Sequence, residues 1–115
     1  MLGNLGQIAS LLKNSGKIQE SMKQMQNRLA AARFVGEAGA GQVRATVDGK
    51  GEVVAVKIEQ TLVIAGDVEM LEDLVTAAFR DAVARSREAM SSEMASMGNE
   101  FGMPNIGDML KQMGQ

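Results

Sequence analysis

The side chains best suited to chemistry in this sequence are its lysines and arginines, because the chain contains no His, Cys, Trp or Tyr. Those missing types include most general acids and bases near neutral pH and the soft ligands of metal ions. No Ser-Lys or paired-carboxylate arrangement stands out from the charge expected on solvated helices. We therefore expect no catalytic site, no metal and no cofactor, and an enzyme is the least favoured interpretation.

The basic residues are concentrated in the first half of the chain, although the net charge is -2. Residues 1–58 hold eight Lys or Arg and four acids, whereas residues 59–115 hold four and ten. At 100° per residue, Lys13, Lys17 and Arg28 cluster on one side of a helix, away from its apolar seam. Cations one or two turns apart can follow a nucleic-acid backbone by contacting its phosphates. A solvated polar face is the alternative interpretation.

The helix that positions these cations is predicted over residues 5–33, which are rich in Gln, Lys, Met, Leu and Ala. At 1.5 Å per residue it would be about 40 Å long, more than a small sheet can cover. Gly16 is its weak point, since Gly costs ~1 kcal/mol relative to Ala inside a helix. A 3–4 spacing gives the helix a narrow seam made of Ile8, Leu11, Ser15, Ile18, Met22, Met25, Leu29 and Ala32.

Extended periodicity replaces helical periodicity over residues 36–59, which predicts a hairpin. The alternating apolar positions are Val43, Ala45 and Val47 in the first strand and Val54, Val56 and Ile58 in the second. Between them, residues 48–51 (Asp-Gly-Lys-Gly) supply a turn that tolerates positive φ. Residues 33–37 are a third extended piece for the sheet edge, and Gly36, Gly39 and Gly41 indicate a bend. These glycines lie between a helix and a strand, the wrong order for a phosphate-binding loop.

A second helix is predicted after a connector at residues 60–66, with Asp67 as its N-cap, and it extends to about Met97. One apolar stripe suited to the hairpin comprises Leu71, Leu74, Val75, Ala78 and Ala82. A second stripe, rotated around the helix, comprises Phe79, Val83, Met90, Met94 and Met97. A small sheet can bury only one stripe, so the second predicts a homodimer interface. Arg80 and Arg87 lie beside the second stripe, where either they extend a basic surface or the nearby Asp81 and Glu88 neutralise them.

The length and composition predict a single domain over residues 1–97, with a Gly- and Met-containing tail over residues 98–115. No apolar run reaches the ~20 residues of a spanning helix, and the first residues lack the pattern of a secretory signal. The absence of Cys suits a reducing compartment. A cytoplasmic protein without membrane contacts is therefore expected.

Five segments in this order and spacing carry a resemblance to a known family. They are MKQMQ (22–26), GEAGAGQV (36–43), VDGKGEV (47–53), VKI (56–58) and EMLEDLVTAAFRDA (69–82). Together they resemble the YbaB/EbfC family of bacterial nucleoid-associated proteins, over about residues 18–97. The resemblance implies an α+β protomer of order α-β-β-β-α and a tight, tweezer-like homodimer. It also implies cytoplasmic, nucleoid-associated binding of double-stranded DNA without catalysis.

The expected function is therefore binding of duplex DNA by a homodimer, through phosphate contacts from Lys13, Lys17, Arg28, Arg80 and Arg87. No helix-turn-helix or zinc finger is recognisable, so sequence preference is expected to be weak or based on DNA shape. The alternative is a non-enzymatic protein-interaction module, in which the Met-rich helical surface docks a client and the basic residues are only solvated.

Overall fold

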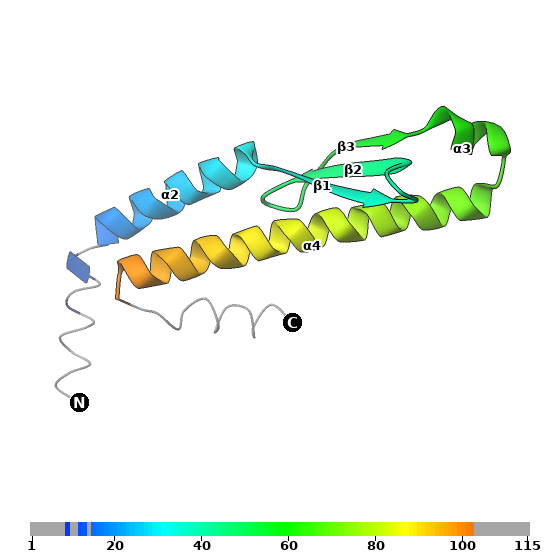
Figure 1. Cartoon of the computed structure of the whole chain (residues 1–115). Helices are drawn as coiled ribbons and strands as arrows, with labels where there is room; N and C mark the ends of the chain where they lie inside the picture. Colours follow the sequence, from blue (N-terminus) through cyan, green and yellow to red (C-terminus); the bar gives the residue numbers. More distant parts are fainter. Residues whose placement is uncertain (1–8, 10–11, 14, 103–115) are drawn as a thin grey trace. The chain divides into compact units, whose positions relative to one another are not determined.

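The computed structural model describes residue 9, residues 12–13 and residues 15–102. Its elements are α2 (Ser15–Ala31), β1 (Arg33–Ala38), β2 (Val43–Asp48), β3 (Val53–Ile58), α3 (Gln60–Ala65) and α4 (Val68–Glu100) (Figure 1). The order agrees with the predicted α+β protomer, apart from α3. The backbone divides into two compact units, one of residues 28–90, which contains the sheet, and one formed from residues 1–27 and 91–115.

The helix α2 forms over a stretch rich in Gln, Lys, Met and Ala, and it includes Gly16. It ends at Ala31, and the guanidinium of Arg33 donates hydrogen bonds to the carbonyls of Ala30 and Ala32 (2.8 and 2.9 Å). These bonds satisfy carbonyls that the last turn of a helix leaves without partners. The predicted helix over residues 5–33 is therefore too long at its end, because Arg33 already belongs to β1. Residues 9, 12 and 13 are helical, and the rest of its start lies outside the described residues.

The three strands form an antiparallel sheet in the order β1-β2-β3, with β2 in the centre. β1 pairs with β2 from Arg33↔Asp48 to Ala38↔Val43, and β3 pairs with β2 from Val47↔Val53 to Val43↔Ile58. The second ladder carries a register shift at Thr46/Val47. The predicted hairpin and the predicted edge strand are both confirmed, the latter one residue longer than expected.

The glycines of the sheet serve two different purposes. Gly39 and Gly41 have φ of 62° and 87°, and Gly51 has φ of 84°, so these three occupy the left-handed region that turns require. Gly36 lies inside β1, and the prediction that the chain bends there is wrong. A Cβ on Gly36 would lie 3.0 Å from Ala82 Cα and nearer still to the carbonyl of Ala78. Its missing side chain therefore allows α4 to approach β1 closely.

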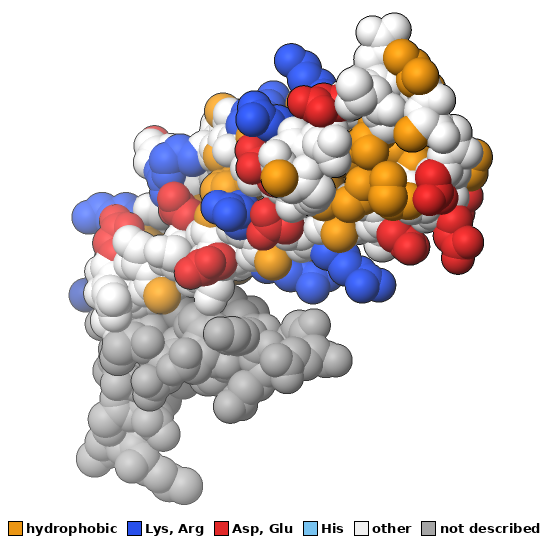
Figure 2. Space-filling view, turned by 45° about the vertical axis from the view of Figure 1, so that its right-hand side comes forward, with side chains coloured by type: hydrophobic (Ala, Val, Ile, Leu, Met, Phe, Trp, Pro, Cys, Tyr) orange, Lys and Arg blue, Asp and Glu red, His pale blue; other side chains and the backbone are white. Residues whose placement is uncertain are grey.

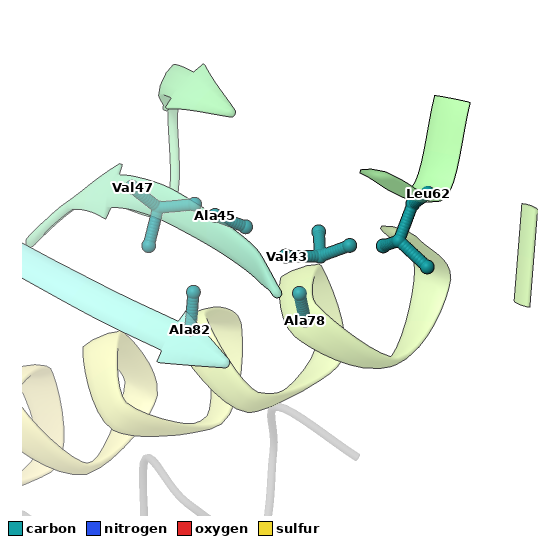
Figure 3. Packing of buried hydrophobic residues seen from close by; sticks show 6 residues of the cluster. All are labelled: Val43, Ala45, Val47, Leu62, Ala78 and Ala82. Carbon is teal, nitrogen blue, oxygen red and sulfur yellow. The ribbon is translucent and has the colours of Figure 1, made fainter. Parts of the chain in front are cut away.

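The helix α4 runs along one face of the sheet, and the buried core lies between them (Figure 1). The core consists of Val43, Ala45 and Val47 from β2, Leu62 from α3, and Ala78 and Ala82 from α4 (Figure 3). Leu71, Leu74 and Val75 pack partly buried against this cluster. The predicted stripe is therefore confirmed as the side of α4 that packs on the sheet, but of the two hairpin strands it covers β2 and leaves β3 exposed.

The predicted connector at residues 60–66 is wrong, because residues 60–65 form the short helix α3. Its helical turn brings Leu62 into the core, and Gly66 closes it in the left-handed conformation with φ of 73°. The carboxylate of Asp67 then accepts a hydrogen bond from Met70 N (3.1 Å), as an N-cap does. The cap prediction is confirmed, and α4 continues three residues beyond the predicted end at Met97.

Candidate nucleic-acid interface

The three cations predicted on the first helix, Lys13, Lys17 and Arg28, are all exposed. Lys17 and Arg28 lie on α2, eleven residues apart, which is close to three helical turns. They therefore follow one side of the helix. The apolar side is marked by Met25 and Leu29, which are buried. Lys13 is also helical, and residue 14, between it and α2, is not described.

Arg80 and Arg87 are exposed and lie about two turns apart on α4. The helical period turns them away from the side of α4 that packs on the sheet, where Ala78, Ala82 and Ser86 are buried. Asp81 does not neutralise Arg80, because its carboxylate accepts from Glu37 N (3.2 Å) at the edge of β1 and pairs with Arg85 (3.4 Å). Arg80 and Arg87 thus lie on the solvent side of α4, where the exposed acid Glu88 adjoins Arg87.

Three arginines outside the predicted set make defined structural contacts. Arg33 binds the carbonyls at the end of α2, Arg44 pairs with Glu37 (3.2 Å), and Arg85 pairs with Asp81. Exposed ion pairs of this kind contribute ~0–1 kcal/mol each, so their main effect is to orient the side chains. None of these three was predicted as a phosphate contact.

Acidic side chains gather where α3 ends and α4 begins, as the red side chains at the right of Figure 2 show. The exposed acids in this stretch are Asp67, Glu69, Glu72 and Asp73, and Glu59 is a further exposed acid at the start of α3. Carboxylates at the start of a helix are stabilised by the helix dipole, so they have a structural reason to be there. These carboxylates repel a polyanion from the start of α4. The sides of the helices that carry the cations are therefore the surfaces that a polyanion can approach.

Residues 4–101 match the family model described as the YbaB/EbfC DNA-binding family. The chain belongs to this family. A similar fold is found in the crystal structure of the uncharacterized protein HP0035 from Helicobacter pylori, with a TM-score of 0.69 and 20% identity, covering 76% of this chain and 91% of that chain. Membership of the YbaB/EbfC family confirms the resemblance and supports a nucleoid-associated DNA-binding role.

The YbaB/EbfC family is described by DNA binding rather than by a reaction. Within the described residues, no group of three or more acidic side chains is placed to hold a metal ion. No helix in the same part of the chain is long and apolar enough to cross a membrane.

The buried polar groups of this family member have structural roles. Asp48 accepts hydrogen bonds from Lys50 N and Glu52 N (2.8 and 3.0 Å), which shape the turn between β2 and β3. The buried hydroxyl of Ser86 donates to Asp48 O (2.9 Å) and so ties α4 to that turn. These contacts fix the sheet on the helix that carries Arg80 and Arg87.

The residues predicted for a dimer interface are not the most exposed apolar residues of the fold. Phe79 and Val83 are partly buried against the core, and Met90 and Met94 are half-buried. The large apolar side chains exposed between residues 53 and 70 are Val53, Val54, Val56, Ile58, Val63, Ile64, Val68 and Met70. The alternating pattern of β3 predicted an apolar face. It did not indicate that α4 covers β1 and β2 and leaves β3 exposed.

Proposed function

We propose that this protein binds duplex DNA as a homodimer, mainly through phosphate contacts from basic side chains on its two long helices. The observation that carries the proposal is the match of residues 4–101 to a DNA-binding family. The dimer is the tweezer-like one that the family resemblance implies, in the cytoplasm and associated with the nucleoid. Exposed Lys and Arg at helical spacing on α2 and α4 support the same function.

The proposed contacts are Lys13, Lys17 and Arg28 from the first helix and Arg80 and Arg87 from α4. Each pair on one helix side is spaced by whole turns, so both members can face the same backbone. Neutralised phosphates release counterions, which makes such binding strong at low salt and weak at high salt. No recognised base-reading helix is present in the sequence, so preference among sequences comes from DNA shape and flexibility.

The homodimer doubles the number of cations that one duplex meets. Its proposed interface includes Phe79, Val83, Met90 and Met94, which lie on one flank of α4 by helical spacing. Each of these side chains is only partly covered within the protomer, so a second copy would complete their burial.

The first experiment measures binding of the purified protein to a labelled random-sequence duplex by fluorescence anisotropy across a salt series. Light scattering on the same sample gives the mass of the oligomer. We expect a dimer whose log affinity falls linearly with log salt, with a slope of about -0.9 for each phosphate contact. A dimer that does not bind DNA even at low salt would favour the protein-docking alternative.

The second experiment compares two triple variants that lose the same charge. The site variant is Lys13→Gln/Lys17→Gln/Arg28→Gln, and the control is Lys23→Gln/Lys50→Gln/Lys57→Gln, whose residues are exposed and lie outside the proposed site. We expect the site variant to stay dimeric, to lose affinity for all duplexes alike, and to lower the salt slope by up to about 5 for six contacts per dimer. An equal loss in both variants would mean that net charge, and not this surface, governs binding.

A further inference from the structure

Four large apolar side chains are exposed on α3 and the first turn of α4. They are Val63, Ile64, Val68 and Met70, which are 57%, 75%, 63% and 41% exposed. Leu62 takes the buried position of α3, and the helical period turns Val63 and Ile64 about 100° and 200° away from it. These apolar side chains are therefore not part of the core. Single exposed apolar residues are normal, whereas a group of them marks an interaction surface.

Exposed carboxylates accompany these apolar side chains, and in Figure 2 acidic and hydrophobic side chains lie beside each other at the start of α4. We call this surface, formed by residues 59–73, the acidic corner. Its stretch of sequence contains no Lys or Arg. The acids are Glu59, Asp67, Glu69, Glu72 and Asp73, so the acidic corner carries five negative charges and no positive one.

Local structure does not account for all of this charge. Asp67 caps α4, and Glu69 lies in the first turn, where the helix dipole favours a carboxylate. Glu72 and Asp73 lie beyond the first turn, where the dipole effect has faded. No ion pair among the described residues includes a carboxylate of the acidic corner. Its negative charge is therefore left unpaired within the described part of the chain.

The charge of the acidic corner limits what can cover its apolar side chains. The phosphates of DNA and of anionic lipid headgroups are repelled by it. A two-fold contact of the corner with itself would bring two sets of five carboxylates together without one cation, and like charges facing each other oppose association. A matching partner must supply apolar side chains and basic side chains together.

We propose that the acidic corner binds a basic amphipathic helix of another protein. Apolar side chains at i, i+3, i+4 and i+7 of that helix pack on the four exposed apolar side chains of the corner. Lys and Arg beside them pair with Glu72 and Asp73. The surface is small, so the contact belongs to the weak and transient class.

This inference goes beyond the proposed function, because the proposed DNA contacts lie outside residues 59–73. DNA and the basic helix would occupy different surfaces of the protein. A copy bound to DNA then still presents the acidic corner, and it can hold a second protein next to the duplex.

The test uses a labelled amphipathic peptide of about 18 Leu and Lys residues, with Leu at helical spacing, and fluorescence anisotropy to measure its binding. A peptide of the same composition in shuffled order is the control for charge alone. We expect the amphipathic peptide to bind the unaltered protein at least about tenfold more tightly than the shuffled one. Its binding should weaken as salt is raised, because the charged contacts are exposed.

The apolar contact is tested with Ile64→Ser, and Leu12→Ser is the matched control. Both side chains belong to helical residues, and they are 75% and 71% exposed. Substitutions at such exposed positions change stability little. We expect Ile64→Ser to weaken binding of the amphipathic peptide at least about tenfold, and Leu12→Ser to change it less than about twofold.

The charged contact is tested with Glu72→Gln/Asp73→Asn. Its control is Glu20→Gln/Glu88→Gln, which removes two negative charges from exposed acids outside the acidic corner. We expect the first variant to bind the peptide more weakly and with a shallower salt dependence than the second.

Equal binding of the two peptides, equal losses in a variant and its control, or no binding to the unaltered protein overturns the docking proposal. Light scattering on Ile64→Ser examines the other possible occupant. A loss of oligomer mass that Leu12→Ser does not show would mean that a second copy covers the acidic corner, and this also overturns the proposal. Ile64→Ser should bind duplex DNA as the unaltered protein does. A failure of peptide binding therefore leaves the proposed DNA binding standing, and a failure of DNA binding leaves the docking proposal standing.

Discussion

Gly49→Ala tests how closely the β2–β3 turn is fitted to the end of α2. Gly49 has no positive φ to explain it, and a Cβ at this position would lie 2.6 Å from Leu29 O and 2.7 Å from Leu29 Cα. Ordinary van der Waals contact begins at 3.4 Å. Because the nearest atom, Leu29 O, belongs to the backbone, the turn must move away from it by about 0.8 Å. That shift also stretches the hydrogen bond from Gly49 N to Leu29 O, now 2.7 Å long.

The two losses give the expected magnitude. Overpacking in a fitted site costs about 1–3 kcal/mol, and the weakened hydrogen bond costs about 1 kcal/mol. We expect the free energy of unfolding to fall by about 2–4 kcal/mol, which lowers the midpoint of thermal unfolding by roughly 10 °C or more. Urea unfolding followed by circular dichroism measures the change, at one protein concentration for all variants because dimers are stabilised by concentration.

Gly16→Ala is the control, because it makes the same chemical change with the opposite expected sign. Gly16 is in α2, is exposed, and has no atom within 4 Å of the position its Cβ would take. Alanine there should raise the stability of the helix by up to about 1 kcal/mol. If Gly49→Ala unfolds within about 0.5 kcal/mol of the unaltered protein, the fit of the turn against Leu29 is not what excludes a side chain.

Two further substitutions test the contacts that hold α4 on the sheet. Gly36→Ala places a Cβ against the backbone of Ala78 and Ala82, and we expect a loss of about 3 kcal/mol in the free energy of unfolding by urea, with Gly16→Ala again as control. Ser86→Ala removes the buried hydroxyl that donates to Asp48 O, and we expect a loss of about 1 kcal/mol with an unchanged denaturant slope. A Ser86→Ala protein with unaltered stability would show that this hydrogen bond is replaced without cost.

The parts of the fold that were predictable are those with a regular period. Alternation identified β2 and the hairpin, and the 3–4 spacing of Leu71, Leu74, Val75, Ala78 and Ala82 identified the side of α4 that meets the sheet. The short helix α3 was missed, because six residues with one buried leucine carry no period long enough to recognise. The roles of Gly36 and Gly49 were also hidden, since close approach of a distant backbone leaves no local pattern.

For the candidate contacts, spacing predicts only the side of the helix on which each residue lies. It placed Arg80 and Arg87 together on α4, where both are exposed, and their contact with DNA stays a prediction. It did not show that Asp81, their neighbour in sequence, is turned to the β1 edge. Nor did it separate these arginines from Arg33, which has the same charge but serves the end of α2. The roles of Asp81 and Arg33 depend on residues that they contact in the folded chain. Those contacts do not appear as a periodic pattern in the sequence.

An overall charge of -2 is compatible with DNA binding because the acids gathered at the start of α4 lie apart from the proposed contacts. Asp73 is the acid of this group nearest to Arg80, and Arg80 follows it by seven residues, or about 10 Å along the axis. Exposed charges farther apart than ~8 Å are largely screened at physiological ionic strength. The acidic end therefore subtracts little from the potential at Arg80, and still less at Arg87. As salt is lowered the screening length grows, so the acids should oppose binding most where phosphate contacts are strongest, and the measured salt slope should be shallower than the contact count alone predicts.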